Sequence, residues 1–98
     1  MRTKEAVAKR IRNSCIERKI TSNALSRISY VPQATIKSIL NDESKNPGVV
    51  TIKKICDGFG ISLADFFAAN EFDRLEQEFE QKKDIHEGVS PIIDVLLV

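Results

Sequence analysis

The chain has 98 residues, 42% of them hydrophobic, which fits one small globular domain with little room to enclose both a cofactor and a substrate. The net charge of +1 hides an asymmetry: residues 1–54 hold twelve Lys and Arg against four Asp and Glu, whereas residues 55–98 hold three against ten. We therefore expect a binding protein rather than an enzyme. The asymmetry predicts a basic surface for a polyanion in the first half and an acidic, solvated or partner-facing region in the second. The alternative is that both regions are only solubilising surfaces.

No metal, cofactor or membrane motif is visible in the sequence. Cys15 and Cys56 are far apart, lie among apolar positions and form no CxxC pair, which favours buried reduced thiols over a disulfide or a zinc site. The single histidine, His86, has polar neighbours, and we expect it to be exposed. The chain starts without the apolar stretch of a signal peptide, and its longest apolar run is too short to cross a bilayer. We expect a cytoplasmic protein without cofactor or metal.

The first predicted helix extends from Thr3 to about Lys19. Apolar residues recur near the 3.6-residue spacing of a helix, and basic residues occupy the remaining positions. The apolar set is Ala6, Val7, Ile11, Cys15 and Ile16, and the basic set is Lys4, Lys9, Arg10, Arg12 and Arg18. This pattern indicates one buried face and a basic outer face.

Residues 21–40, TSNALSRISYVPQATIKSIL, predict two short amphipathic helices joined by a tight turn. Thr21 is a good N-cap for the first, because its hydroxyl can accept a hydrogen bond from a backbone amide two or three residues on. Pro32 disfavours helical dihedrals at the preceding residue, so this helix should end near Ser29 or Tyr30. Proline also suits the first turn of the next helix, because its missing N–H would be unpaired there.

The second of these helices should bury Ile36, Ile39 and Leu40 and turn small polar residues outward. The outward residues are Gln33, Ala34, Lys37 and Ser38. A DNA major groove admits one helix while a second, packed across it, fixes its angle to the backbone. The pair therefore predicts sequence-specific binding of double-stranded DNA, with these four residues reading bases. The alternative for each residue is an ordinary solvated side chain.

Two further helices are predicted after the polar loop 41–48. Thr51 should cap the first of them, and Gly60, which tolerates a left-handed conformation, should end it. Ser62 and Asp65 have the spacing of a capping box that opens the last helix. The apolar residues of the two helices are Ile52, Ile55, Cys56, Phe59, Leu63, Phe66 and Phe67. Five helices thus fit within residues 3–69.

With these elements in place, the chain resembles the Cro and phage-repressor-like helix-turn-helix proteins, often called the Xre family. The resemblance covers roughly Ile11 to Phe67. It is most specific in ILNDESKNPGVVTIKKICDGFGISLADFF, which looks like the family's stretch from the end of the recognition helix through helix five. The resemblance implies an all-α, five-helix DNA-binding domain.

Site residues follow from the resemblance position by position. Gln33, Ala34, Lys37 and Ser38 match base-reading positions on the third helix. Ser22 and Asn23 match positions beside a phosphate at the start of the second helix, and Thr35, Lys45 and Asn46 match other backbone-contacting positions. Phosphate contacts of this kind fix the register, and base contacts choose the sequence.

Three residues depart from the family pattern. The family usually has Gln near the position of Ser22, Ala at that of Ser26, and Gly at that of Tyr30 in the turn. If the turn requires a left-handed residue, Tyr30 costs on the order of 1 kcal/mol.

The C-terminal third is expected to add a helix and a tail. Between Glu71 and Lys83, Phe72, Leu75 and Phe79 recur at intervals of three and four, which predicts a helix that packs on the domain or pairs with a second subunit. After Ser90 and Pro91, the run IIDVLLV favours an extended strand, for which we prefer an exchange between two subunits; a disordered end and a chain truncated before a further domain are the alternatives.

The sequence thus predicts an all-α, phage-repressor-like domain over residues 1–69, followed by a C-terminal helix and a short extended tail over residues 70–98. We expect a transcriptional regulator that binds operator DNA as a homodimer, the third helix entering the major groove. The alternative is an antitoxin-like module, in which residues 70–98 bind a protein partner and the helix-turn-helix autoregulates.

Overall fold

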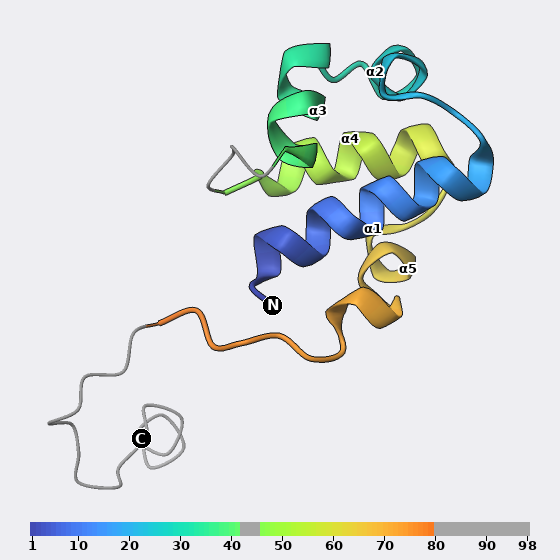
Figure 1. Cartoon of the computed structure of the whole chain (residues 1–98). Coiled ribbons are helices and arrows are strands. Elements are labelled where there is room, and N and C mark those ends of the chain that lie inside the picture. The colour runs from blue at the N-terminus through green and yellow to red at the C-terminus, as the bar shows by residue number, and fades with distance from the viewer. Residues whose placement is uncertain (42–45, 80–98) are drawn as a thin grey trace, which may run out of the picture.

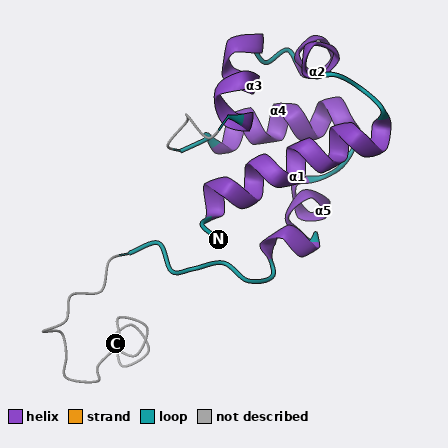
Figure 2. Cartoon of the chain, in the orientation of Figure 1, coloured by secondary structure: helices purple, strands orange, loops and turns teal. Residues whose placement is uncertain are grey.

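The computed structural model describes residues 1–41 and 46–79, and within these residues every regular element is helical (Figures 1 and 2). The elements are α1 (Thr3–Arg18), α2 (Ser22–Ser29), α3 (Gln33–Leu40), α4 (Val49–Phe59), α5 (Leu63–Phe67) and the 3-10 turn η1 (Asn70–Phe72). In Figure 1, α2 and α3 lie together at one end of the molecule, and α5 lies on the other side of α1. The predicted all-α, five-helix fold is confirmed.

Most helix ends are where the capping residues predict them. The Thr21 hydroxyl accepts a hydrogen bond from the Ala24 amide at 3.1 Å, and the Ser62 hydroxyl accepts one from the Asp65 amide at 3.0 Å. Gly60 ends α4 with φ of 76°, in the left-handed region that glycine favours. These local signals therefore determine where α2 and α5 begin and where α4 ends.

Two helix starts differ from the prediction, by three residues at α4 and by one residue at α3. Helix α4 begins at Val49 rather than after Thr51, because extended Gly48 acts as its N-cap and its carbonyl accepts a hydrogen bond from the Ile52 amide at 3.0 Å. Pro32 is the N-cap of α3 rather than its first helical residue. In both cases the cap is a backbone conformation and not a side-chain acceptor.

One hydrophobic core joins all five helices. Leu25, Ile36 and Ile55 are at its centre, each with at most 1% of its surface exposed. The complete set is Val7, Ala8, Ile11, Cys15, Leu25, Val31, Ile36, Ile39, Ile52, Ile55, Cys56, Phe59 and Phe66. Burying one such aliphatic or aromatic side chain contributes roughly 1.5 to 3 kcal/mol. The predicted core is thus confirmed, with Leu40 and Leu63 at its edge, except that Ile16, predicted on the buried face of α1, is 67% exposed.

Both cysteines are free and buried, as the sequence predicts. Burial raises the pKa of the Cys15 thiol and of the Cys56 thiol above its ordinary value. Both residues also contribute to the hydrophobic core. They therefore act as small apolar core residues.

Helices α2 and α4 approach closely at Gly58. A Cβ atom at this position would lie 3.1 Å from the Ser29 Cβ and 3.2 Å from the Ser29 Cα. The second of these neighbours is backbone, so a side chain could be accommodated only if α2 moved. The glycine therefore allows α2 to lie close against α4, and α2 in turn positions α3.

The predicted helix between Glu71 and Lys83 is wrong over residues 71–79. Only η1 is helical there, and residues 73–79 run on without helical structure along the N-terminal end of α1 (orange in Figure 1). Phe72 packs on the core, its ring centroid 4.9 Å from that of Phe67, whereas Leu75 and Phe79 are 36% and 47% exposed. Three apolar residues at helical spacing are therefore too few to form a helix face that is buried against the domain. Residues 80–98, including the predicted strand and His86, lie outside the described residues.

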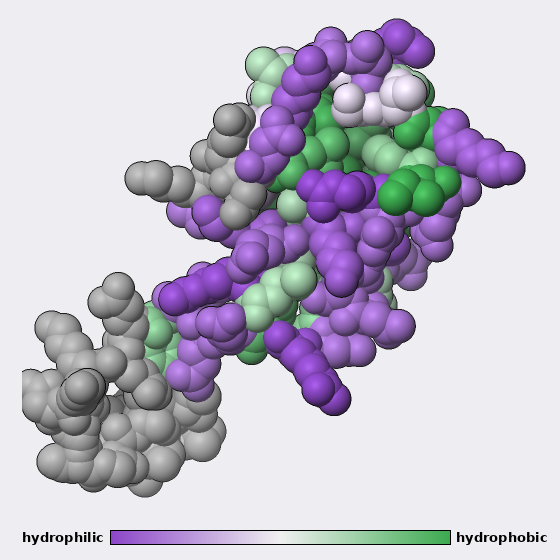
Figure 3. All heavy atoms as spheres, viewed as in Figure 1, coloured by the Kyte–Doolittle hydropathy of each residue, from purple (hydrophilic) through white to green (hydrophobic). Residues whose placement is uncertain are grey.

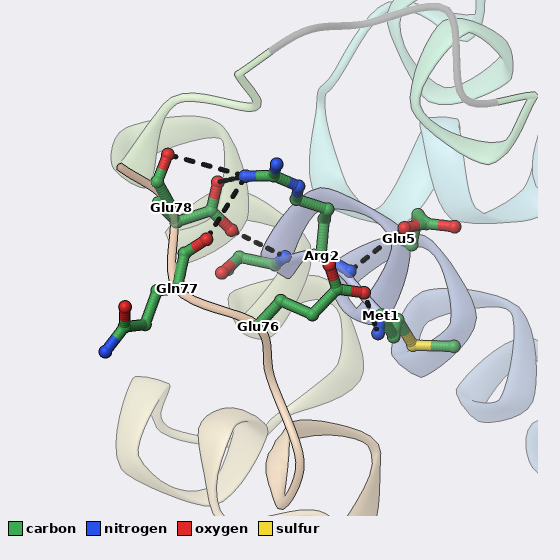
Figure 4. Close-up of polar contacts among 7 residues, drawn as sticks. Met1, Arg2, Glu5, Glu76, Gln77 and Glu78 are labelled. Atoms are coloured by element: carbon green, nitrogen blue, oxygen red, sulfur yellow. Dashed lines mark hydrogen bonds and ion pairs between the residues drawn. The ribbon is translucent and has the colours of Figure 1, made fainter. Parts of the chain in front are cut away.

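We call residues 73–79 the acidic arm, because its carboxylates bind the start of α1 (Figure 4). The Glu76 amide donates to the Met1 carbonyl at 3.1 Å, and the Glu76 carboxylate lies 2.7 Å from the Met1 amino group. The Thr3 amide donates to the Glu78 carboxylate at 3.0 Å. The Arg2 guanidinium donates to the carbonyl oxygens of Gln77 and Glu78 at 3.3 and 3.4 Å. The arm thus supplies negative charge at a helix N-terminus, where the helix dipole favours it.

The charges of these carboxylates are stabilised by their partners. The hydrogen bond and the charge of the Met1 amino group lower the pKa of Glu76, and the hydrogen bond from Thr3 lowers that of Glu78. Asn13 donates to the Glu71 carboxylate at 2.9 Å and lowers its pKa in the same way. The folded state therefore favours the ionised form of all three residues.

Candidate nucleic-acid interface

The turn between α2 and α3 contains a residue in the left-handed conformation. Tyr30 has φ of 61° and ψ of 22°, and its amide donates to the Ser26 carbonyl at 3.0 Å, which ends α2. The next residue, Val31, is 3% exposed and anchors the turn in the core. The turn therefore requires the conformation that glycine supplies in the family pattern, and Tyr30 adopts it at a cost on the order of 1 kcal/mol.

Two serine hydroxyls hold this turn. The Ser26 hydroxyl donates to the Val31 carbonyl at 2.6 Å. The buried Ser29 hydroxyl donates to the Leu25 carbonyl at 2.7 Å and accepts from the Val31 amide at 3.3 Å. Both polar backbone atoms of Val31 are thereby paired. The departure at Ser26 thus adds a bond that the customary alanine could not make.

Helix α3 presents the predicted base-reading residues away from the core. Ala34 and Lys37 are exposed, and Gln33 and Ser38 are half-buried. On the opposite side, Ile36 and Ile39 are only 1% and 3% exposed. The structure therefore places all four predicted readers on the outer side of one helix, with no acidic residue among them.

The residues predicted to contact the DNA backbone lie at two element starts and on α3 itself. Ser22 is half-buried and Asn23 exposed in the first turn of α2, where unpaired backbone amides and the helix dipole favour an anion. Thr35 is half-buried within α3, and Asn46 is exposed just before α4. Lys45 lies outside the described residues.

Three arginines of α1 bind the C-terminal ends of three other helices. The Arg12 guanidinium donates to the carbonyl of Leu40, the last residue of α3. The Arg18 guanidinium donates at 3.3 Å to the carbonyl of Phe59, the last residue of α4, and lies 4.6 Å from the centre of its ring. Each pair places a cation on carbonyls that have no partner within their own helix.

Arg10 makes the third and most extensive of these contacts, at the end of α5. Its Nε and Nη2 donate to the carbonyl oxygens of Phe66 and Asp65 at 2.9 and 3.2 Å. Its Nη1 donates to the Ser14 hydroxyl at 3.2 Å, and the guanidinium lies 5.5 Å from the centre of the Phe66 ring. A single side chain thus connects α1 with the end of α5.

The predicted basic outer face of α1 is confirmed, since Lys9, Arg12 and Arg18 are exposed, but its arginines also have a structural role. The guanidinium groups of Arg10, Arg12 and Arg18 bind the protein's own carbonyls, so these residues support the fold. Spacing within α1 identifies which residues face outward but not what each long side chain reaches across the surface. Together with the serines of the turn, Arg12 fixes α3 at both of its ends.

The space-filling view shows hydrophobic residues reaching the surface among α2, α3 and α4, while mainly hydrophilic residues cover α1 (Figure 3). Among the described residues, no helix is long and apolar enough to cross a membrane. The same part of the chain contains no group of three or more His, Cys, Asp and Glu side chains placed to hold a metal ion.

Two short helices joined by a fixed turn, with polar residues outward on the second, define a helix-turn-helix protein. A family model described as a Cro/C1-type HTH DNA-binding domain matches residues 10–71, well over half of the chain. The chain belongs to this family and is a DNA-binding regulator. Searches of curated proteins and of solved structures give no match.

Proposed function

We propose that the chain recognises operator DNA by inserting α3 into the major groove of double-stranded DNA. The observation that carries this proposal is the placement of Gln33, Ala34, Lys37 and Ser38 on the outer side of α3, while hydrogen bonds hold the turn before α3 and the last carbonyl of α3. Fixed geometry favours recognition, because the binding energy is not used to order the reading helix.

The proposed base readers have distinct chemistries. Gln33 can pair with the N6 and N7 atoms of adenine, and Lys37 can donate to the acceptors of guanine. The methyl group of Ala34 can pack on the methyl group of thymine, and the Ser38 hydroxyl can donate or accept. Binding, rather than catalysis, is thus the proposed activity.

Contacts to the DNA backbone would set the register of α3. We assign them to Ser22, Asn23, Thr35, Lys45 and Asn46. Ser22 and Asn23 belong to the first turn of α2, and Asn46 to the segment that leads into α4. Such contacts add affinity without sequence preference.

A homodimer is the proposed binding form, because one short reading helix makes few contacts at physiological salt. Two copies of α3 would enter successive major grooves about one helical turn apart. In this proposal residues 1–69 form the DNA-binding unit, and residues 70–98 contribute to dimerisation through exchange of the tail segment 90–98. Removing residues 90–98 and measuring the mass in solution tests the exchange, because an unchanged dimer would exclude it.

Selection of bound duplexes from a random library, at stated salt, tests the recognition proposal. An inverted-repeat consensus would support specific binding and twofold symmetry together. Lys37→Ala should relax the preference at one position, whereas Lys45→Ala should weaken all sequences alike and lower the salt dependence. Lys9→Ala, on the α1 surface, serves as the control. Unchanged binding in both test variants would show that α3 is not the reading helix.

The acidic arm favours a second candidate function, an antitoxin-like role in which the C-terminal region binds a protein. Leu75 and Phe79 are 36% and 47% exposed on this arm, among Glu76, Gln77 and Glu78. Apolar side chains in an acidic segment suit a partner with a basic, partly apolar groove. A partner that co-purifies with the chain, together with weak affinity of the chain for DNA, would favour this role.

A further inference from the structure

Tyr30 combines backbone strain with an exposed aromatic ring. Its φ of 61° lies in the left-handed region, and 87% of its surface is exposed. No other large hydrophobic residue in the described part of the chain is as exposed. A strained residue that is not buried needs a reason outside the packing of the domain.

The fold makes no use of the tyrosine side chain. Within residues 1–41 and 46–79, the phenol ring and hydroxyl take part in no hydrogen bond or ring contact. Glycine or asparagine would adopt the same backbone with less strain. Ser26 and Ser29 hold the turn through Val31, so they would keep its geometry with either residue.

Tyr30 lies close along the chain to the start of the proposed reading helix. Tyr30 ends α2 and lies three residues before Gln33, the first residue of α3. Three peptide units span at most about 11 Å, and a tyrosine side chain extends over part of that distance. In helix-turn-helix docking, the N-terminal residues of the recognition helix approach the base edges, between the two sugar-phosphate backbones.

We propose that Tyr30 contacts the DNA backbone next to the operator half-site, a role that rests on the proposed function of α3. The phenol hydroxyl donates a hydrogen bond to a phosphate oxygen, and the ring lies against the adjoining deoxyribose. Tyrosine is among the side chains that make such phosphate contacts. The contact adds affinity for every sequence alike, and because the phenol is neutral it releases no counterion.

Three substitutions separate the roles of the ring, the hydroxyl and the backbone. Tyr30→Gly removes the strain and the side chain together, so the urea midpoint of unfolding should rise while the affinity for a selected operator duplex falls about tenfold. Tyr30→Asn should have the same two effects. Tyr30→Phe keeps the ring and the strain, so its stability should equal that of the parent while its affinity falls severalfold.

The salt dependence provides an independent readout. The slope of affinity against salt should stay unchanged in all three variants, in contrast to Lys45→Ala. Ile16→Ala, which removes a 67% exposed apolar side chain from α1, is the matched control and should leave affinity unchanged. Tyr30→Gly binding as tightly as the parent would overturn the inference. Failure of the parent chain itself to bind any selected duplex would instead overturn the proposed function.

Discussion

Ser26 and Ser29 are the residues that explain how the α2–α3 turn tolerates a tyrosine in a left-handed conformation. Their hydroxyls pair both the carbonyl and the amide of Val31, at 2.6 and 3.3 Å. A strained residue persists only where its surroundings determine its conformation. Both serines precede Tyr30, and their hydroxyls fix Val31, the residue immediately after the strained position.

Replacing Ser26 by Ala should therefore lower the free energy of unfolding. The lost hydrogen bond leaves the Val31 carbonyl without its donor, which costs about 1 kcal/mol. Ser38→Ala is the matched control, because it makes the same change inside α3 and reports only the gain in helix propensity. Urea unfolding of both variants gives the difference. Equal stability of the two would mean that the Ser26 hydroxyl does not support the turn.

At the scale of elements, α1 organises the other helices through its arginines. Arg12, Arg18 and Arg10 bind carbonyls at the ends of α3, α4 and α5 respectively. The C-terminal end of a helix carries partial negative charge, so a guanidinium there is electrostatically favourable. The planar donors of arginine also match several carbonyls at once, which a lysine cannot do.

Arg10→Ala should destabilise the domain by about 1 to 2 kcal/mol, because it removes three hydrogen bonds and the stacking on Phe66. Arg10→Lys should recover only a small part of this loss, since one ammonium group cannot reproduce the fork of donors. Thermal or urea unfolding measures both variants. Lys9→Ala, at the neighbouring position, should change stability by less than about 0.5 kcal/mol. Full recovery by lysine would contradict the role of the planar guanidinium.

The sequence predicted the elements that depend on local chemistry. Thr21, Ser62 and Gly60 mark helix ends through caps and backbone freedom, and Ile36 with Ile39 marks the inner side of α3 through periodicity. The start of α4 was missed, because Gly48 caps it through its backbone conformation. The outer side of α3 is where the sequence predicted it, and contact of its residues with DNA stays a prediction.

Contacts between residues far apart in the sequence could not be predicted from local patterns. Nothing in the sequence near Arg12 indicates that its side chain reaches Leu40, and nothing near Glu78 indicates that it meets Thr3. The predicted helix failed over residues 71–79 for a related reason. Spacing alone suggested an apolar stripe, but carboxylate bonds to the start of α1 hold the acidic arm in another conformation.

At the scale of the whole molecule, opposite charges of the two halves meet at the start of α1. The acidic arm lies away from α2 and α3 in Figure 1, so it leaves the outer side of α3 uncovered. The charge asymmetry of the sequence thus has an internal component: acidic residues bind the N-terminal end of α1, and basic residues of α1 bind helix C-termini.

Attachment of the acidic arm should depend on pH. The pKa values of Glu71, Glu76 and Glu78 are lowered in the folded state, so the unfolded chain binds more protons as the pH falls below the ordinary carboxyl pKa of about 4.3. The stabilisation is therefore present above that pH and is lost as the pH falls through the lowered values. Hydrogen exchange at the Thr3 amide should accelerate, relative to the intrinsic rate at each pH, over this range.

A pair of variants isolates the carboxylate responsible. Glu78→Gln should expose the Thr3 amide to exchange even at neutral pH, because a neutral amide oxygen is a weaker acceptor than a carboxylate. Asp73→Asn, an exposed acidic position on the same arm, should leave this amide protected. If the Thr3 amide of Glu78→Gln stayed protected from exchange at both neutral and acidic pH, a group other than Glu78 would cap α1.

The arginine contacts of α1 also bear on how the domain loses its structure. The C-terminal ends of α3, α4 and α5 all bind arginines of α1. Detachment of α1 therefore removes these contacts from all three helices at once. The α2–α3 pair is therefore no autonomous fragment, and the described core should melt in a single cooperative step. Recognition and global stability are in this sense inseparable properties of the molecule.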